Sequence, residues 1–381
     1  MPERALDLAV LGGGPVGCAF ALALHGSAHR VAVFEQRARA AGALHGERPI
    51  ALSYASRLVL ERLGAWPRIA PTPIETIHVS QAGSFGRTRL EAREAGVPAL
   101  GYVVGYAALE QALLERAADC GIEIVREVAF AERAHSGETV RLRGKCGDRP
   151  IEVAARCVVH AEGGSDEASE KRYAQEAVIG VLSSAPRAGT TAFERFTAEG
   201  PLAMLPMAGR YALVWAMRPE RAAALAAEAP EGFLAALAQA FGGRAGRLEA
   251  IEQRVRVPLV LRVRAARHGA REVYIGNAAQ TLHPVAGQGL NLGLRDAWEL
   301  GCELRGSADP GDARALASYA AQRRLDAAAT VRVTDLLATA FAGDNPLGRL
   351  ARGCALGALD GCAPARRFFA RRMIFGRSAM P

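Results

Sequence analysis

The sequence contains almost no lysine. Its 381 residues include 47 basic ones, of which only Lys145 and Lys171 are lysines, so arginine carries nearly all of the positive charge. The arginines are spread along the whole chain, and the formal net charge is +8. A nucleic-acid-binding protein is expected to gather its basic residues into one patch or stripe. The dispersed charge therefore argues against nucleic acid as a partner.

Motifs for disulfides, metals and membrane spans are also lacking. The 7 cysteines include no CxxC pair, and no cluster of cysteine and histidine has the spacing of a zinc site. An odd number of cysteines favours reduced thiols, which are typical of a cytoplasmic protein. No apolar run reaches the length of a transmembrane helix. With 50% hydrophobic residues, the sequence predicts a cytoplasmic globular protein without a metal site.

The strongest local motif lies near the N-terminus. An apolar run, Leu6–Leu11, leads into Gly12-Gly13-Gly14-Pro15-Val16-Gly17, and an apolar helical pattern follows over Val16–Leu24. In such a GxGxxG turn, the first glycine permits the tight turn and the second lets a pyrophosphate approach the backbone. The third glycine allows the helix and the strand to pack closely. The helix N-terminus would then face the phosphates with its free N–H groups.

An acidic residue completes this dinucleotide-binding pattern. Glu35 lies 18 residues after Gly17, at the end of a second apolar strand, Val31–Phe34. A carboxylate at this place can accept hydrogen bonds from both hydroxyls of an adenosine ribose. Glu35 disfavours a 2′-phosphate at the site, so FAD or NAD fits better than NADP.

A second glycine-rich segment arrives late in the chain, over Gly276–Asp296. It suits a long cofactor that is held at both ends, because only one GxGxxG fingerprint is present. The backbone N–H groups of Gly289, Leu290 and Asn291 could stabilise the negative charge of a reduced flavin. The late segment therefore favours FAD over NAD.

The pattern of elements changes along the chain. Strands and helices alternate over the first 160 residues, with a helix predicted over Ala51–Leu63. Residues 174–217 read as strands of a sheet with its own core, and Glu220–Phe241 reads as one alanine-rich helix. From Ala313 onward the chain is predicted to be helical. The sequence thus predicts an α/β nucleotide-binding domain built from non-contiguous segments, with a β-rich domain inserted.

At the late segment a family resemblance becomes specific. Its pattern G-N-A-A-Q-T-L-H-P-x-A-G-Q-G-x-N-L-G-x-R-D resembles the ubiquinone-biosynthesis flavoprotein hydroxylases of the 2-polyprenyl-6-methoxyphenol hydroxylase type, which are aromatic-ring FAD monooxygenases. The resemblance runs nearly end to end. Other matching stretches are Glu47–Ser53, Phe85–Leu90, Leu100–Val104, Glu194–Thr197 and Gly200–Met207.

Together with the pattern of elements, the resemblance implies a fold that is α/β, and α+β overall. An FAD-binding Rossmann-like domain is expected over residues 1–72, 98–173 and 268–345. An inserted mixed β-sheet is expected to form the substrate domain over residues 73–97 and 174–267. Helices are expected over residues 346–381.

The resemblance also implies which residues contact the cofactor. Arg48 would lie near the flavin and the pyrophosphate, Gln111 near the ribityl or phosphate region, and Asn277 on the ribityl chain. The full expected set is Gly12, Gly14, Pro15, Val16, Gly17, Glu35, Arg48, Gln111, Glu162, Asn277, Pro284, Gly287, Gln288, Gly289, Leu290 and Asn291. Leu205, Pro206 and Trp215 are expected in an apolar substrate pocket. No catalytic side chain is assigned, because the flavin carries the chemistry. His283 would lie beside the flavin and could act as a base, but a histidine in such a place more often orients a loop.

The implied reaction is the hydroxylation of a polyprenylated phenol. NAD(P)H would reduce FAD as a transient co-substrate, O2 would add to give a C4a-hydroperoxide, and the phenol ring would attack its distal oxygen. One motif departs from the family, because the usual A-D-G reads Ala161-Glu162-Gly163 and the serine and arginine expected after it are missing. Two alternatives stay open: a non-catalytic flavin-fold scaffold of a quinone-synthesis complex, and a flavin-dependent lipid reductase.

The basic segment Arg366–Phe375 mixes arginine with aromatic residues. One interpretation is a C-terminal helix that docks its apolar face on the protein. The other is a peripheral contact with the inner membrane or with proteins of a quinone-synthesis complex.

Overall fold

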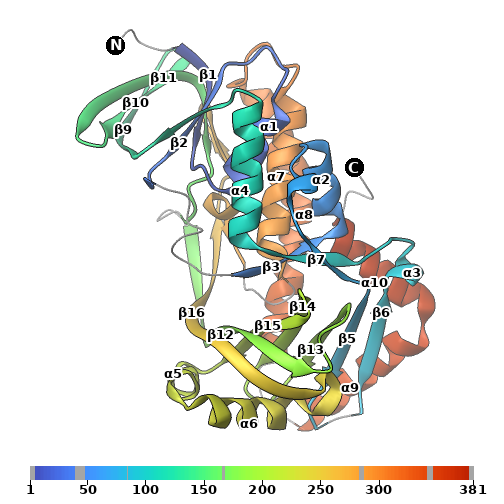
Figure 1. The fold of residues 1–381 in the computed structure, drawn as a ribbon. Coiled ribbons are helices and arrows are strands. Elements are labelled where there is room, and N and C mark those ends of the chain that lie inside the picture. The colour runs from blue at the N-terminus through green and yellow to red at the C-terminus, as the bar shows by residue number, and fades with distance from the viewer. Residues whose placement is uncertain are drawn as a thin grey trace.

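The computed structural model describes residues 5–38, 48–83, 85–164, 168–282, 287–340 and 346–376. Within these ranges the chain forms two eight-stranded sheets and a small three-stranded sheet, with helices packed between and around them (Figure 1). The three sheets draw their strands from segments that are far apart in the sequence. The division into an FAD-binding domain and a substrate domain stays a prediction.

The first large sheet contains the N-terminal β-α-β unit. Strand β1 (Ala5–Leu11) is parallel to β2 (Val31–Glu35) on one side and to β11 (Arg149–His160) on the other. The sheet order is β17-β18-β11-β1-β2-β8, and a hairpin of β9 and β10 continues from β11. The remaining strands are β8 (Glu123–Arg126), β9 (Val128–Ser136), β10 (Thr139–Cys146), β17 (His268–Gly269) and β18 (Glu272–Tyr274).

The carboxyl ends of the parallel strands meet at one edge of this sheet. Leu11 pairs with both Phe34 and His160, and His160 pairs with Tyr274. Four loops, which begin at residues 12, 36, 161 and 275, therefore leave the sheet side by side. In open α/β sheets, ligands bind outside this edge.

Three helices stand together beside the first sheet, as Figure 1 shows for α1 (Pro15–Ala23), α4 (Tyr106–Asp119) and α7 (Gln288–Leu304). Phe20, Leu109 and Leu300 belong to the fully buried core between these elements. The helices α2 (Tyr54–Arg62) and α8 (Ala313–Ala340) flank α7. The small sheet lies next to them, in the order β3 (Pro49–Ser53), β7 (Gly101–Gly105) and β4 (Thr72–Ile74).

The second large sheet runs in the order β19-β16-β12-β15-β14-β13-β5-β6. Its strands are β5 (Thr76–Gln81), β6 (Arg87–Glu91), β12 (Ala168–Ala185), β13 (Thr191–Phe196), β14 (Pro201–Met207), β15 (Arg210–Met217), β16 (Arg247–Arg264) and β19 (Gln280–Thr281). One face packs against α5 (Pro219–Ala227) and α6 (Pro230–Phe241), which lie below the sheet in Figure 1. The single helix predicted over Glu220–Phe241 is wrong, because Pro230 begins a new helix.

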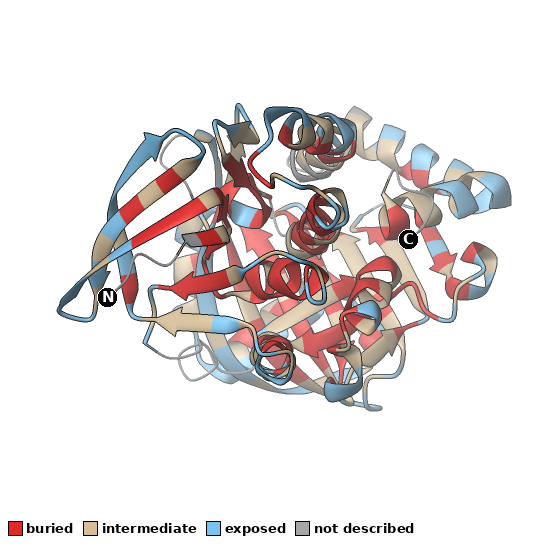
Figure 2. Ribbon diagram, turned by 90° about the horizontal axis from the view of Figure 1, so that it is seen from above, coloured by how far each residue is buried: buried red, intermediate tan, exposed pale blue. Residues whose placement is uncertain are grey.

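The chain ends in α9 (Pro346–Gly361) and α10 (Ala363–Phe375), which pack near β6 and the short α3 (Ala92–Ala95). Ala370, Ile374 and Phe375 are buried in this contact, so α10 docks an apolar face on the protein. Figure 2 shows that buried residues gather along the strands and inner helices, while the outer helices carry exposed ones. None of the helices in the described ranges combines the length and hydropathy needed to span a bilayer.

Candidate functional site

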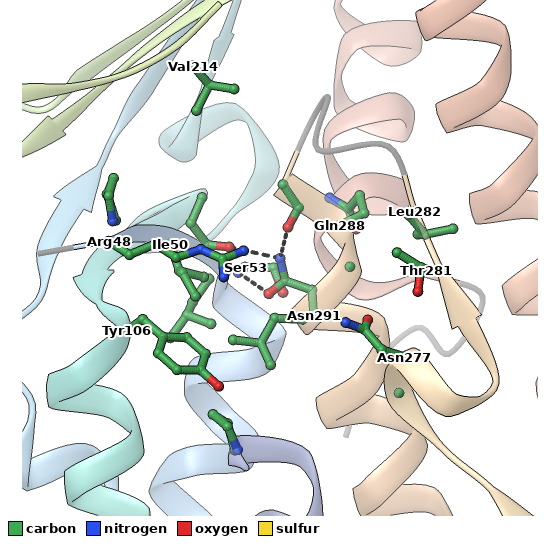
Figure 3. Close-up of a pocket in the computed structure, with 18 of the residues that line it drawn as sticks. Arg48, Ile50, Ser53, Tyr106, Val214, Asn277, Thr281, Leu282, Gln288 and Asn291 are labelled. Carbon is green, nitrogen blue, oxygen red and sulfur yellow. Dashed lines mark hydrogen bonds between the residues drawn. The ribbon is translucent and has the colours of Figure 1, made fainter. Parts of the chain in front are cut away.

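A cavity of about 1010 Å³ lies between the carboxyl edge of the first sheet and one face of the second. Its lining falls into three parts. The N-terminal turn and Glu35 form one end, the start of α7 with β3 and Asn277 forms the middle, and the second sheet forms the other end. Figure 3 shows the middle part, with Tyr106 on one side, Asn277 on the other and Asn291 between them.

The glycine turn is packed tightly on one side and open on the other. Gly12 has φ +104°, and a Cβ on it would lie 2.6 Å from the backbone of Ala161. A Cβ on Gly17 would lie 2.0 Å from the Gly12 oxygen, so the helix and the strand touch there. By contrast, a Cβ on Gly14 would meet only the Tyr106 hydroxyl, at 3.9 Å. The open side, next to the free N–H groups of the α1 N-terminus, is a cradle that fits a pyrophosphate.

Glu35 lies buried directly behind this cradle. Its Oε2 accepts hydrogen bonds from the Gly13 N–H at 2.8 Å and from Arg37 Nη2 at 3.2 Å. Its Oε1 accepts from the Arg37 N–H and Nε, both at 2.9 Å. Burial alone would raise the pKa of the Glu35 carboxyl, but the hydrogen bonds from Arg37 and Gly13 outweigh it and lower this pKa. The carboxylate is therefore an ionised acceptor, and a ribose would take over contacts that Arg37 now makes.

Asn291 joins the start of α7 to the strand β3 and the helix α2. Its Oδ1 accepts hydrogen bonds from the Ser53 N–H and the Ser56 hydroxyl, both at 2.7 Å. Its Nδ2 donates to the carbonyls of Ala51 at 3.0 Å and Gly287 at 2.7 Å. The amide is thus used fully by the protein, as the dashed lines in Figure 3 indicate in part. Asn291 holds the second helix N-terminus of the cavity in place.

The turn that carries Asn277 is braced from behind by Asp296. This fully buried carboxylate accepts hydrogen bonds from the Gly276 N–H at 3.2 Å and from Gln280 Nε2 at 2.8 Å. Arg323, from α8, donates to its other oxygen at 2.7 Å. Asn277 itself is exposed and faces the cavity. The turn can therefore present its side chain without losing an internal contact.

Most of the cofactor-binding residues expected from the sequence lie around this one cavity. The lining includes Gly12, Gly14, Pro15, Val16, Glu35, Arg48, Glu162, Asn277, Gly287, Gln288, Gly289, Leu290 and Asn291. Gly17 lies beneath the cradle rather than in the lining. The guanidinium carbon of Arg48 stands 5.7 Å from the ring centre of Tyr106. Pro284 and His283 lie outside the described residues.

Three expected residues lie elsewhere. Gln111 is exposed on α4 and donates to Glu115 at 2.8 Å, away from the cavity lining. Side chains alternate between the two faces of a strand, so Leu205 and Val214 face the cavity while their neighbours Pro206 and Trp215 do not. Trp215 packs on the opposite face against Phe233 of α6, with ring centres 6.4 Å apart. Neither Pro206 nor Trp215 therefore belongs to the lining of this cavity.

The altered motif at Glu162 rests on a buried histidine. Nδ1 of His160 contacts Glu162 Oε1 at 2.9 Å, and its Nε2 contacts Glu272 Oε2 at 3.1 Å. The His160 ring stacks on Tyr274, with ring centres 4.4 Å apart. Burial lowers the pKa of His160, but the two carboxylates raise it by more, so the pKa is raised overall. Arg37, His160 and Glu272 belong to no motif of the sequence, so sequence reasoning missed them.

Comparison with known proteins agrees with this geometry. A family model described as FAD binding domain matches residues 5–334. The chain is 32% identical to ubiquinone hydroxylase UbiL of Rhodospirillum rubrum, in a match that covers 97% of this chain and 89% of that protein. The chain belongs to the FAD-binding family of flavoprotein hydroxylases. It is also 28% identical to 3-demethoxyubiquinol 3-hydroxylase of Escherichia coli, over 96% of this chain and 98% of that protein.

Solved structures match the fold of this flavoprotein along its length. The p-nitrophenol 4-monooxygenase PnpA from Pseudomonas putida superposes with a TM-score of 0.79 at 16% identity, covering 98% of this chain and 99% of that chain. HpxO of Klebsiella pneumoniae, in complex with FAD, gives a TM-score of 0.77 with the same identity and coverage. The predicted fold class and the family resemblance are confirmed, and FAD is the cofactor of this flavoprotein.

The cavity has the donors that this cofactor needs. The open side of Gly14 at the α1 N-terminus fits a pyrophosphate, and the Glu35 carboxylate beside it has the acceptor oxygens that a ribose would need. The start of α7 offers a second set of free N–H groups at the middle of the cavity, where nothing would meet a Cβ on Gly289 within 4 Å. Two helix N-termini facing one cavity suit an anionic cofactor that carries a long isoalloxazine end.

Proposed function

We propose that this flavoprotein hydroxylates a polyprenylated phenol in ubiquinone biosynthesis, with NAD(P)H as the transient reductant and O2 as the oxygen source. The observation that carries the proposal is the continuity of one cavity. It runs from the nucleotide cradle past the start of α7 to an apolar face of the second sheet. A cofactor bound at one end would thus present its reactive ring to an apolar substrate at the other.

The substrate end of the cavity is built for an apolar molecule. Alternate residues of the second sheet face it, and the aliphatic and aromatic ones are Ile77, Val79, Leu90, Ala177, Ile179, Ala192, Phe196, Ala203, Leu205, Val214 and Ala216. Leu356, Leu359, Phe369, Met373 and Ile374 continue the lining onto α9 and α10. Such a wall favours a prenyl chain and keeps water away from the reacting atoms.

The chain's own contribution is to bind and orient. When bound, FAD supplies the redox chemistry and the activation of O2. The N–H groups at the start of α1 would hold the negative charge of the pyrophosphate, and those at the start of α7 would stabilise negative charge on the flavin ring. Asn291 and Asp296 fix the two loops that line the middle of the cavity. Asn277 then stands where it can hydrogen-bond a polyol chain.

The test uses the purified holoprotein and a short-chain prenylated phenol. We expect NADH or NADPH to bleach the flavin absorption under anaerobic conditions. After O2 is admitted, we expect a product that is heavier by one oxygen atom. A product heavier by two hydrogens would instead support the lipid reductase. A flavin that is neither reduced nor able to oxidise any phenol would support the scaffold.

We further propose that α9 and α10 contact an anionic membrane surface. Phe368 is 73% exposed and Leu350 is 53% exposed, although both are large apolar residues. Arg367 is exposed beside Phe368, and α10 contains no acidic residue. Because these helices also line the cavity, an apolar chain could pass from a bilayer to the flavin. Sedimentation with anionic but not with neutral vesicles is expected, and Phe368→Ser should weaken it. Equal recovery with both vesicle types would contradict the proposal.

A further inference from the structure

One acidic side chain stands in the apolar end of the cavity. Glu194 lies in the middle of β13, and it belongs to the cavity lining. Its neighbour Phe193 points the other way, toward α6, where its ring centre is 5.5 Å from that of Phe241. Ala192, two residues before Glu194, packs on the cavity side with Val103. The alternation of the strand therefore directs the Glu194 carboxyl into the cavity.

The pairing of strands places Glu194 in the cavity wall that the second sheet forms. Glu194 pairs with Ala203 of β14, and Ala203 pairs with Val214 of β15. Figure 3 shows Val214 on the sheet that faces Arg48 and Ser53 across the cavity. Since neighbouring strands are about 4.8 Å apart, Glu194 lies roughly 10 Å from Val214 along the same face. The carboxyl is thus on the wall opposite the flavin-binding loops.

The surroundings of this carboxyl are apolar. On the flanking strands the cavity face carries Ile77, Val79, Thr88, Leu90, Ala203 and Leu205, and from α9 and α10 it carries Leu356, Leu359, Phe369 and Met373. The charged residues of the cavity lining, Glu35, Arg37, Arg48 and Glu162, come from the nucleotide half. The ionisable neighbours His78 and Arg195 face α6, as their contacts with Phe193 and the Ala240 carbonyl show.

Among the described residues, the Glu194 carboxyl has no hydrogen-bond or ion-pair partner. Burial is the one cause that acts on it, and burial raises the pKa of Glu194 to about 8. A partnerless carboxyl in an apolar wall costs stability, so a purely structural role gives no reason to keep it. A substrate hydroxyl is the kind of group that would complete its hydrogen bonding.

We propose that Glu194 is the catalytic acid–base residue of the substrate cavity and takes the hydroxyl proton of the bound phenol. The inference rests on the proposed function. The phenol O–H bond breaks, its proton forms a bond to a Glu194 carboxylate oxygen, and its electron pair stays on the phenol oxygen. The resulting phenolate has more electron density on its ortho and para carbons, which are the positions that the proposed hydroxylation would attack. A base with a pKa near the working pH is the most effective for such a transfer.

The test compares pH profiles of the holoenzyme with a short-chain prenylated phenol. In the unmodified protein, kcat should rise about tenfold per pH unit up to about pH 8 and then level, because the ionised carboxylate is the active form. Glu194→Gln should lower kcat by about 100-fold with little change in KM. Its activity should climb only toward the pKa of the phenol itself, about 10. Glu194→Asp should keep the rise near pH 8 at a lower rate.

Two further measurements keep the outcomes distinct. Difference infrared spectra of the unmodified protein and Glu194→Gln should contain a protonated-carboxyl band that disappears with a midpoint near pH 8. Glu199→Gln, the same change outside the cavity lining, should leave the band and the profile unaltered. If Glu194→Gln hydroxylates the phenol with an unchanged profile, the role of Glu194 is refuted while the proposed function stands. If the unmodified protein binds the phenol without hydroxylating it, the proposed function itself fails.

Discussion

Asn291 accepts a hydrogen bond from the backbone N–H of Ser53 at 2.7 Å, although 238 residues separate them in the chain. The contact ties the first turn of α7 to the end of β3, and both elements line the cofactor cavity. Because all four hydrogen-bonding positions of the amide are used by protein groups, Asn291 acts by positioning the first turn of α7, which lines the cavity. Its side chain has no capacity left for the cofactor itself.

Replacing Asn291 should therefore damage the loop before it damages any direct contact. Asn291→Ala removes one hydrogen-bond partner from each of four groups, which are the Ser53 N–H, the Ser56 hydroxyl and the carbonyls of Ala51 and Gly287. We expect the free energy of unfolding to fall by about 1–3 kcal/mol and the flavin content to fall with it. Urea unfolding and the flavin released per chain on denaturation measure the two effects.

Asn277→Ala is the matched control for this prediction. Asn277 is exposed and faces the cavity, so its loss should leave the unfolding free energy unchanged while it weakens FAD binding. An Asn291→Ala variant that kept full stability and lost flavin only would mean that the amide touches the cofactor directly.

The glycine turn offers a second contrast, between alanine substitutions at two positions that are three residues apart. Gly14 has φ −73°, and a Cβ there meets nothing closer than 3.9 Å, so Gly14→Ala should fold normally. It should nevertheless lose most bound flavin, because the methyl group occupies the pyrophosphate side. Gly17→Ala puts a Cβ 2.0 Å from the Gly12 oxygen and should cost at least about 1–3 kcal/mol of stability. Thermal melting and flavin content distinguish the two, and undiminished flavin in Gly14→Ala would refute the cradle.

Glu35 and Arg37 make a third prediction possible. Glu35→Ala removes the carboxylate that we expect to accept from the ribose, so it should weaken FAD binding by about 1–3 kcal/mol, measured by flavin titration of the apoprotein. Arg37→Ala frees the carboxylate instead, so FAD affinity should hold or rise if the ribose replaces Arg37. A loss of affinity in Arg37→Ala would show that the guanidinium itself contacts the cofactor. Glu115→Ala, on the exposed side of α4, serves as the control.

The N-terminal unit could be predicted from the sequence because its signals are local. Glycine spacing, apolar runs and one acid placed β1, α1 and β2 within one or two residues of where the structure has them. By contrast, the helix predicted from Ala51 begins only at Tyr54, since residues 49–53 form β3 instead. That strand pairs with β7, some 50 residues later, and such long-range pairing leaves no local signal.

Which residues of the second sheet face the cavity could not be predicted from the sequence. In any strand, neighbours such as Val214 and Trp215 face opposite ways, but alternation does not tell which of the two faces borders the cavity. The answer depends on α6, which covers the Trp215 side and leaves the Val214 side open to the flavin loops. Trp215 was expected in the pocket because it is large and apolar, but it packs against α6 instead. The direction of Glu194 depends on the same packing, because α6 covers the face of β13 that carries Phe193.

The charged cluster around His160 should make the thermal stability of the protein depend on pH. The imidazole stands between Glu162 and Glu272, and Arg133 also contacts Glu272, at 3.2 Å. Burial would raise the pKa of Glu272, but the hydrogen bond and charge of His160, with Arg133, outweigh it and lower that pKa to about 2. Burial would lower the pKa of His160, but Glu162 and Glu272 outweigh it and raise this pKa. The cluster is thus charged on both sides over the mildly acidic range.

The directions of the pKa shifts of Glu272 and His160 define the pH range in which the cluster stabilises the fold. The carboxylate contributes stability above its ordinary pKa near 4.5, and this is lost as the pH falls toward 2. The imidazolium contributes stability fully below its ordinary pKa near 6.5, and this is lost as the pH rises through its raised pKa. His160→Gln keeps the shape without the charge, so its deficit in Tm should be largest between about pH 4.5 and 6.5 and should shrink at higher pH. His25→Gln, an exposed histidine, should show no deficit at any pH. A deficit of constant size across the pH range would mean that His160 acts by packing against Tyr274 rather than by charge.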